Sequence, residues 1–363
     1  MVFPRTAGIL LHPTSLPGRF GIGEFGPEAV DWLGALSRMR QRLWQVLPLG
    51  PTGYGDSPYQ SLSTFAGNTL LVSFDRLRDA GLLDAADTDG FPRFPLDRVD
   101  FGSVIPARRT LLSRAAERFT RSAPDGLRRA AVAFAERERA WLDDWCLFAA
   151  LKEHFDGRPW VEWPEDVARR DRGALHVAAG RLAGAIERER LLQFFFHEQW
   201  EALRDAARSR AIAIVGDLPI FVAHDSADVW CHPELFHLDA AGRPTVVAGV
   251  PPDYFCEDGQ LWGNPLYRWE AHAADGFAWW SERLRGAFSR FDALRVDHFR
   301  GFAAAWEIPA TAPTAATGRW VEAPGRALFA AARRALGDRP IIAEDLGLIT
   351  PDVEELRQEL GFP

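Results

Sequence analysis

The sequence predicts an α/β fold in which parallel strands form a barrel that is interrupted by insertions. Five short apolar segments, each suited to a strand buried on both faces, are spread over the 363 residues. Segments with helical spacing of apolar residues lie between them, and this alternation is typical of parallel βαβ units. Length alone suggests about two or three domains, but a barrel with insertions uses this much chain as one unit.

The first βαβ unit lies at the start of the chain. Apolar runs at Ala7–Leu11 and Leu43–Leu47 predict two buried strands. Between them, Pro27–Met39 has apolar residues at helical spacing and a proline in its first turn. Residues 50–105 follow as a loop-rich insertion. It begins directly after a strand, and in a parallel barrel this position is the functional face.

Residues 106–210 predict a helical insertion between two barrel strands. Apolar residues recur every seven positions, which places them along one helical stripe of the core, with a short coiled-coil contact as the alternative. A second helix is predicted at Ala183–Arg210. The stripe consists of Leu127, Phe134, Trp141, Phe148 and Phe155.

Three further strands are predicted in the second half of the chain. A long irregular segment at Ala223–Asn264 lies within residues 223–270, which we interpret as a lid and substrate-binding insertion. Residues 306–322 predict a second loop-rich excursion. The strands are Ala211–Asp217, Phe291–Val296 and Pro340–Ala343, and the helices are Trp279–Phe288, Ala327–Leu336 and one that begins at Thr350 and ends before Gly361.

The composition limits the partners and the compartment. The net charge is −8 with acidic and basic residues interspersed, so we expect no nucleic acid and no anionic membrane as partner. No secretory signal is visible, and no apolar run approaches the ~20 residues that span a bilayer. The three cysteines form no CxxC pair, which indicates a reducing compartment, and the cytoplasm is the expected location.

Four residues in the lid segment could suggest a metal site. They are His224, Cys231, His232 and His237. Their spacing matches no zinc pattern, so the sequence predicts scattered polar and buried residues and no metal.

The fourth predicted strand ends in a cluster of charge. Arg295 and Asp297 are two residues apart, so in a strand their side chains share one face. Because a neighbouring arginine lowers the pKa of a carboxyl group, we expect Asp297 to stay ionised. A structural ion pair explains the same pattern, since such pairs also perturb pKa values.

Glu344 ends the next strand, which we expect beside that of Asp297. Neighbouring parallel strands lie roughly 4.8 Å apart, so the two carboxylates are expected within ~5–5.5 Å, the separation in retaining glycosidases. There one carboxylate forms a covalent glycosyl-enzyme and the other is the general acid and base. Asp297 beside Arg295 is then the nucleophile, and Glu344, without such an arginine, has a raised pKa and is the acid/base.

Seven segments together resemble the amylomaltases, the 4-α-glucanotransferases of glycoside hydrolase family 77 in the α-amylase clan. They run in order along nearly the whole chain, which makes the resemblance specific. The segments are Gly8-Ile-Leu-Leu-His-Pro-Thr-Ser-Leu-Pro17, Gly53-Tyr-Gly-Asp-Ser-Pro-Tyr-Gln60, Gly216-Asp-Leu-Pro-Ile-Phe-Val222, Gly249-Val-Pro-Pro-Asp-Tyr-Phe255, Leu261-Trp-Gly-Asn-Pro265, Leu294-Arg-Val-Asp-His-Phe-Arg-Gly301 and Ala343-Glu-Asp-Leu-Gly347.

The resemblance implies an enzyme that transfers α-1,4-glucan segments between maltooligosaccharides by a retaining double displacement, without metal or organic cofactor. It implies maltooligosaccharides and α-1,4-glucans as partners and a monomer when complete. It carries the nucleophile onto Asp297, the acid/base onto Glu344 and an assisting role onto Arg295. It also implies substrate contacts for Ser57, Tyr59, Asp217, Asp253, Gln260, Trp262 and His298. The lid would then shield the intermediate from water.

One feature departs from the family pattern. Family members have a (β/α)8 TIM-type barrel, whereas this chain supplies about the first five strands. The third carboxylate of the clan, in a Thr-His-Asp segment on the seventh strand, has no counterpart here. We therefore expect either a fragment of a longer protein or a chain that needs a complementing piece, and we expect the 363 residues alone to be poorly stable and nearly inactive. Two other functions remain open at this stage: an α-glucan hydrolase with the same carboxylates, and an inactive glucan-binding fragment.

Overall fold

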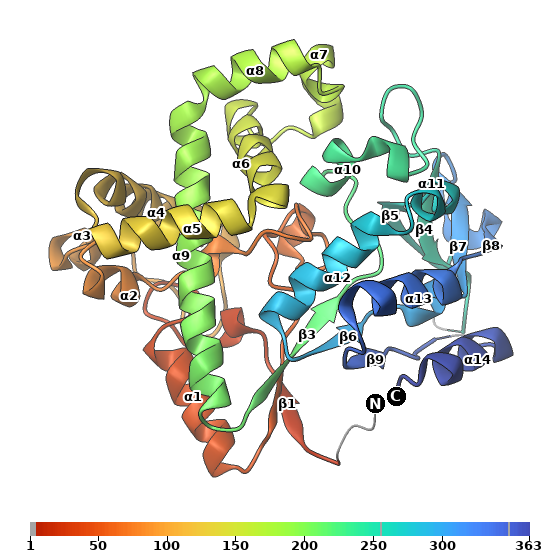
Figure 1. Ribbon diagram of the computed structural model, residues 1–363, viewed down its shortest axis with the longest axis horizontal. Coiled ribbons are helices and arrows are strands. Elements are labelled where there is room, and N and C mark those ends of the chain that lie inside the picture. The colour runs from red at the N-terminus through yellow and green to blue at the C-terminus, as the bar shows by residue number, and fades with distance from the viewer. Residues whose placement is uncertain (1–4, 255, 348) are drawn as a thin grey trace.

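A five-stranded parallel sheet forms the centre of the molecule (Figure 1). The computed structural model describes residues 5–254, 256–347 and 349–363. Residues 1–4, for which we predicted no secretory signal, lie outside the described residues. The strand order is β1-β2-β3-β6-β9. All five predicted strands are confirmed, with ends shifted by a few residues. They are β1 Gly8–Leu10, β2 Leu43–Gln45, β3 Ala213–Leu218, β6 Ala293–Val296 and β9 Ile341–Ala343.

The sheet has two open edges in the described part of the chain. Strands β1 and β9 lie at these edges, so five strands of a TIM-type barrel are present and the barrel is not closed. The prediction that β1 is buried is wrong, because Gly8 is exposed and Leu10 is 53% exposed. Among the described strands β1 pairs with β2 alone, which leaves its other side uncovered.

The register of the sheet sets the positions of the charged residues. Val296 of β6 pairs with Ala343 of β9, so the residues that follow them, Asp297 and Glu344, leave the sheet side by side. On the other side of β6, Arg295 is paired with Asp217 of β3. The C-terminal ends of three neighbouring strands thus meet at one edge, as the sequence predicted.

A second sheet, which is antiparallel, was not predicted. Its order is β5-β4-β7-β8, and its strands are β4 Val246–Val250, β5 Gln260–Pro265, β7 Ala304–Pro309 and β8 Arg319–Glu322. We predicted an irregular segment at Ala223–Asn264 and a loop-rich excursion at 306–322. Both predictions are wrong for the residues that form these four strands. Their apolar runs are short and interrupted by glycine and proline, and β4 pairs with β7, which lies far away in the sequence.

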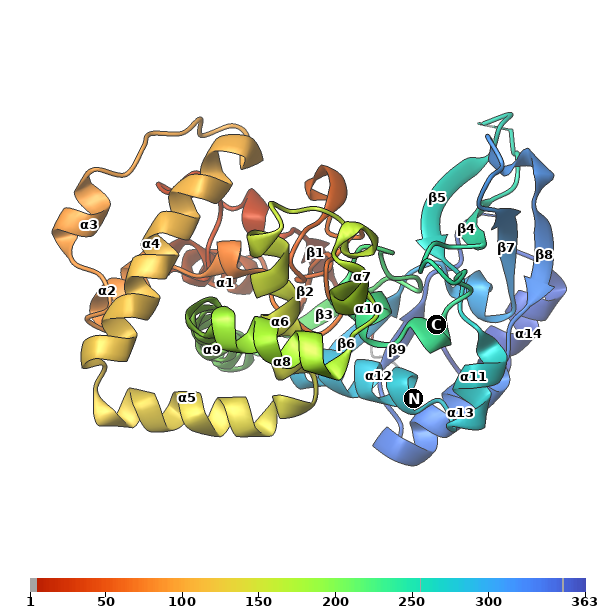
Figure 2. The same cartoon turned by 90° about the horizontal axis from the view of Figure 1, so that it is seen from above.

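Helices fill most of the region between β2 and β3 for which we predicted a helical insertion. Its outer helices lie at the end of the molecule opposite the second sheet (Figure 2). The predicted single stripe is wrong, because the chain turns at Glu138 and divides it between two helices. Phe134 and Phe148 of the stripe are nevertheless core residues. The helices are α4 Phe101–Ser122, α5 Asp125–Arg137, α6 Arg139–His154, α7 Glu165–Ala168, α8 Arg172–Arg181 and α9 Ala183–Arg208, preceded by α2 Phe74–Asp79 and α3 Ala85–Asp89.

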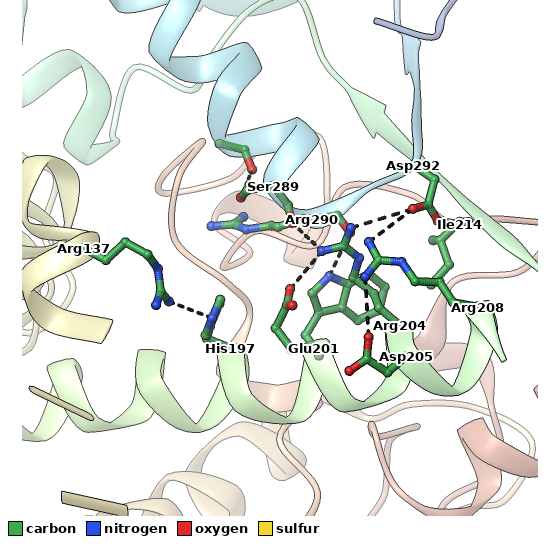
Figure 3. A network of polar contacts seen from close by, with 12 residues as sticks. Arg137, His197, Glu201, Arg204, Asp205, Arg208, Ile214, Ser289, Arg290 and Asp292 are labelled. Carbon is green, nitrogen blue, oxygen red and sulfur yellow. Dashed lines mark hydrogen bonds and ion pairs between the residues drawn. The ribbon is translucent and has the colours of Figure 1, made fainter. Parts of the chain in front are cut away.

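Helix α9 is anchored to the segment that leads into β6 (Figure 3). Arg204 donates to the carbonyl of Ser289, and Arg208 pairs with Asp292 at 3.5 Å. Asp292 also accepts the N–H of Ile214 at 2.9 Å. Ile214 belongs to β3, and Asp292 directly precedes β6. Helix α9 is therefore tied to the N-terminal ends of both strands, and the opposite ends of these strands carry Asp217 and Asp297.

The remaining helices are spread along the chain between and after the strands (Figure 1). The predicted helices are confirmed, and Gly361 ends the last one with φ of 68°, as expected of a glycine cap. Among the residues that the structure describes, no helix is long and apolar enough to cross a membrane. These helices are α1 Pro27–Arg38, α10 Ala227–Cys231, α11 Trp269–Ala274, α12 Ala278–Arg290, α13 Gly325–Leu336 and α14 Pro351–Leu360.

Candidate active site

Three carboxylates surround one guanidinium group at the C-terminal ends of β3, β6 and β9. Arg295 Nη1 lies 2.7 Å from Asp217 Oδ1 and 3.0 Å from Asp297 Oδ1. Its Nη2 lies 3.9 Å from Glu344 Oε1. The two-residue spacing puts Arg295 and Asp297 on one face of β6, and the sheet register adds the other two carboxylates.

Burial outweighs the arginine in the titration of these groups. Desolvation raises the pKa of Asp297, and the charge and hydrogen bond of Arg295 oppose this rise without reversing it. The expectation that Arg295 keeps the pKa of Asp297 low is therefore wrong in direction. Burial and the negative charge of Asp297 raise the pKa of Glu344, as predicted. The premise that Glu344 has no arginine is wrong, since Arg295 faces both carboxylates.

Asp217 is the most deeply buried of the three carboxylates, with a side chain that is 0% exposed. The hydroxyl of Tyr59 donates to Asp217 Oδ2 at 2.6 Å. Burial raises the pKa of Asp217, while Tyr59 and Arg295 oppose the rise. Burial and the Asp217 carboxylate raise the pKa of Tyr59, so its hydroxyl stays protonated. Both carboxylate oxygens of Asp217 therefore accept a hydrogen bond. Oδ1 accepts from Arg295 of β6, and Oδ2 accepts from Tyr59 in the loop after β2.

His298 connects Asp297 to Glu344. Its backbone is left-handed, with φ of 50° and ψ of 46°, which is uncommon for a residue other than glycine. In this conformation its N–H donates to Glu344 Oε2 at 2.8 Å. The imidazole is buried, and the centre of its ring lies 4.8 Å from that of Trp262. Burial, with a smaller effect of Arg300, lowers the pKa of His298 to about 4, so the ring is neutral at pH 7.

Two more of the predicted contacts, Gln260 and Trp262, lie on β5 of the second sheet. Trp262 reaches His298 through its ring, and its Nε1 donates to Gln260 Oε1 at 3.1 Å. Gln260 is exposed. The structure thus brings Tyr59, Asp217, His298 and Trp262 together with the carboxylates, and Gln260 joins them through Trp262.

The last two predicted contacts belong to loops. Ser57 Oγ accepts the N–H of Tyr59 at 3.3 Å, so it shapes the turn that presents Tyr59. Asp253 lies in the connection between β4 and β5, where its Oδ1 accepts the N–H of Cys256 at 2.8 Å. Phe255, the last residue of one family-like segment, lies outside the described residues.

Two further residues of the site region were not predicted. The ring of Phe221 lies 6.3 Å from that of His298 and 6.5 Å from that of Trp262, measured between centroids. Asn264 is buried, and its Nδ2 donates to the carbonyl of Val222 at 2.9 Å. Phe221 and Asn264 lie in two of the seven segments that resemble the amylomaltases. This position in the sequence could have identified them as site residues.

The four residues considered for metal binding are not arranged as ligands. His224 Nε2 lies 2.7 Å from the carbonyl oxygen of Gly242, and His232 lies 3.6 Å from the carboxylate of Glu234. Within the described ranges, no group of three or more His, Cys, Asp or Glu side chains could hold a metal ion.

The profile of one protein family, described as 4-alpha-glucanotransferase, matches residues 11–363. The chain belongs to this family. It is 52% identical over 363 residues to a 4-alpha-glucanotransferase of Thermus thermophilus, with 100% of this chain and 72% of the relative covered. A 4-alpha-glucanotransferase of Streptococcus pneumoniae is 49% identical over 362 residues, with 99% of this chain and 71% of that relative covered. The family comparison thus confirms the resemblance seen in the motifs.

Solved structures agree with this membership. The amylomaltase from Streptococcus agalactiae in complex with acarbose superimposes with a TM-score of 0.95 at 42% identity, covering 99% of this chain and 72% of that one. The amylomaltase from Corynebacterium glutamicum gives a TM-score of 0.77 at 20% identity, covering 98% of this chain and 50% of the other, and it supports the fold alone.

Proposed function

We propose that the full polypeptide containing these residues transfers α-1,4-glucan segments between maltooligosaccharides by a retaining double displacement. One relationship carries the proposal: Asp297 and Glu344 follow paired residues of β6 and β9 and face one guanidinium group. Two carboxylates on one rim are the groups that this mechanism needs. Family membership supports the reaction class.

In the first step, Asp297 attacks the anomeric carbon of the donor glucan. A bond forms between a carboxylate oxygen and C1 while the bond from C1 to the leaving oxygen breaks. Glu344 donates its proton to that leaving oxygen, and its raised pKa increases the protonated fraction available for this step. Arg295, 3.0 Å from Asp297 Oδ1, favours the ionised nucleophile against the effect of burial.

In the second step, the hydroxyl group of an acceptor glucan displaces Asp297 from C1. Glu344, now a carboxylate, removes the proton of that hydroxyl group, so it returns to its starting state. The N–H of His298 donates to Glu344 Oε2 at 2.8 Å and stabilises the carboxylate form between the two steps. Two successive inversions at C1 retain the α configuration.

The remaining residues are assigned to substrate binding. Asp217 and Tyr59 form a hydrogen-bonded pair beside Arg295, which suits the recognition of sugar hydroxyl groups. The ring of Trp262 beside His298 offers an apolar platform for a sugar face. Ser57, Asp253 and Gln260 are proposed as further contacts from the loops and β5. Exclusion of water by the lid would favour a sugar acceptor.

We further propose one catalytic barrel unit over residues 1–363, with insertions at 50–105, 106–210 and 223–270. The close pairing of β3, β6 and β9 at the site supports a single unit. The cytoplasm is the proposed location, supported by the free state of Cys146, Cys231 and Cys256.

Incubation of the full polypeptide with maltotriose tests the reaction. A ladder of longer maltooligosaccharides is the expected result, whereas glucose and maltose alone would identify a hydrolase. Sugar binding without turnover would instead identify a glucan-binding protein. The 363-residue chain tested in parallel shows whether this part is active alone, and we expect almost no turnover from it.

Asp297→Asn tests the assignment of the nucleophile. We expect turnover to fall by on the order of 10³-fold or more, as for removal of other catalytic nucleophiles. Mass spectrometry of the intact protein with a slow glycosyl fluoride substrate should detect the covalent intermediate in the wild type and not in the variant. Normal turnover of the variant would contradict the assignment.

A further inference from the structure

Arg283 of α12 is a buried residue that contacts two separate loops of the active-site rim. Its side chain is 2% exposed. Nη1 donates to the carbonyl of Ile220 at 2.8 Å, and Nη2 donates to the carbonyl of Pro219 at 2.5 Å. Nε donates to Thr64 Oγ1 at 2.7 Å. One planar group thus ties the loop after β3 to the loop after β2.

The neighbours of Arg283 hold the guanidinium group in place. The hydroxyl of Tyr267 donates to the carbonyl of Ile220 at 2.7 Å and accepts from Arg283 Nη1 at 3.1 Å. The rings of Trp279 and Trp280 lie 5.4 and 4.7 Å from Arg283 Cζ, where cations are attracted to aromatic faces. Tyr267 and the two tryptophan rings fix the position of the guanidinium group. The carbonyls of Pro219 and Ile220 are then positioned by their hydrogen bonds to it.

The loop held by Arg283 begins at the catalytic carboxylates. Pro219 follows Asp217 by two residues. The carbonyl of Leu218, between them, accepts the N–H of Asp297 at 3.0 Å. A shift of Pro219 would therefore move the Asp217 side chain and the peptide group of the nucleophile together.

The hydrogen bonds of Arg283 border a small gap in the packing behind the site. A small cavity of about 50 Å³ is lined by both members of the Tyr59–Asp217 pair and by Arg283. A cavity of this size has room for water and is bordered by polar groups. The hydrogen bonds of Arg283 therefore hold the Pro219–Ile220 segment beside this gap, in addition to the pairing of β3 with β6 that places Asp217.

We propose that Arg283 is a positioning residue of the transferase site. It fixes the carbonyls of Pro219 and Ile220, and thereby aligns Asp217 and its hydrogen bond to Tyr59 for glucan transfer. It touches neither substrate nor reacting atoms. This inference rests on the proposed function. It requires the forked geometry of arginine, because one lysine ammonium group cannot reach the acceptors on both loops in these directions.

The variants Arg283→Lys and Arg283→Met in the full polypeptide test this role. Matched controls are Arg285→Lys and Arg285→Met, because Arg285 is an exposed residue of the same helix that contacts Glu282. Turnover of maltotriose is measured below the melting temperature, and intact sites are counted by the stoichiometry of acarbose binding. We expect kcat per site to fall roughly 10- to 100-fold in both Arg283 variants, since small misplacements have effects of this size. KM should change much less, and the controls should match the wild type.

Chemical rescue separates positioning from stability alone. In Arg283→Ala, added methylguanidinium should restore part of kcat per site, and methylammonium should not. A wild-type kcat per site in Arg283→Lys would overturn the proposal, because a purely structural residue changes only the number of intact sites.

Milder variants decide the question if the Arg283 variants do not fold. Tyr267→Phe and Thr64→Val each remove one partner of the guanidinium group, and both should lower kcat per site. Unchanged kcat in both would overturn the proposal. If the wild-type protein forms no oligosaccharides longer than maltotriose, the proposed transfer is refuted and the role of Arg283 is not. The Arg283 variants would then be compared with the wild type by their rate of glucose release.

Discussion

The backbone N–H of His298 donates to Glu344 Oε2 at 2.8 Å, so the residue that follows Asp297 contacts the carboxylate on the neighbouring strand. The left-handed backbone of His298 directs this N–H toward β9. The contact favours the ionised form of Glu344, whereas burial and the charge of Asp297 favour the protonated form and raise its pKa. The proton affinity of Glu344, the proposed acid/base, is thus set by groups that follow both strands.

Arg295→Gln should move the pH profile of kcat/KM to higher pH. The positive charge of Arg295 opposes the rise in pKa of both Asp297 and Glu344, so both limbs should shift upward without it. The acidic limb, which reports Asp297, should shift further, because Arg295 lies 3.0 Å from Asp297 and 3.9 Å from Glu344. The profile is measured with maltotriose, with the exposed Arg326→Gln as control. Limbs that stay in place would contradict the role of Arg295.

Glu344→Gln should stabilise the fold at neutral pH. The pKa of Glu344 is raised in the folded state, so the folded protein binds this proton more tightly than the unfolded chain does. The free energy of unfolding is therefore lowered as pH rises through the folded pKa, and a neutral amide avoids that loss. The gain in Tm should shrink at a pH below the ordinary pKa of glutamate, about 4.3. Thermal melts of both proteins at the two pH values are the measurement, and an equal or lower Tm of the variant at neutral pH would refute the argument.

Tyr59→Phe should reduce kcat/KM for maltotriose by roughly 10- to 100-fold, since a hydrogen bond to a charged group contributes about 1.5–3 kcal/mol. The variant leaves Asp217 Oδ2 without the donor that lies 2.6 Å away in the wild type. A double-mutant cycle with Asp217→Asn isolates the pair, and the losses should be less than additive. Additive losses would mean that the two side chains act independently.

The parallel strands and the carboxylates at their ends could be predicted because their signals are local. Ala211–Asp217 is a nearly continuous aliphatic run, and a polar residue ends it. The second sheet has no such signal. β4 carries a register shift between Val247 and Gly249, and its partner β7 comes much later in the chain. Pairing of this kind is decided by tertiary contacts.

The energetics of the site were harder to predict than its residues. Arg295 beside Asp297 is visible in the sequence, but the burial that reverses the expected pKa shift depends on how loops cover the strand ends. Arg283 looks like an ordinary charged residue of an amphipathic helix. Its importance follows from the loops and tryptophan rings that surround it, and these meet only in the folded protein.

Trp262→Ala should raise the share of hydrolysis among the products. The ring of Trp262 lies against His298 at 4.8 Å between centroids, so its removal opens the site to water beside Glu344. We expect KM to rise roughly 2- to 10-fold, the equivalent of an aromatic contact of about 0.5–1.5 kcal/mol. Trp262→Phe keeps an aromatic ring and should lie between the alanine variant and the wild type. Product ratios from maltotriose decide the matter, and an unchanged ratio in Trp262→Ala would exclude a shielding role.

Lys152→Arg should destabilise the fold. Lys152 is the single lysine among the 42 lysine and arginine residues of the chain, so a specific reason for a lysine at this position is expected. Its Nζ donates to the carbonyls of Gly157 and Arg158 at 2.7 and 2.9 Å and to Asp225 Oδ2 at 2.7 Å. Three acceptors around one nitrogen match the three donors of an ammonium group, whereas the longer planar fork of arginine cannot place its donors in this way.

The Lys152 contacts join the helical insertion to the segment after β3, so their loss should affect the whole fold. We expect the free energy of unfolding to fall by about 1 kcal/mol, because at least one hydrogen bond at Nζ is lost and its acceptor is left to water. Urea unfolding of the full polypeptide is the measurement. Arg139→Lys, an exchange at an 81% exposed side chain of the same helix, is the control and should stay within about 0.5 kcal/mol of the wild type. If both variants are as stable as the wild type, the geometry at Nζ does not explain why a lysine occurs there.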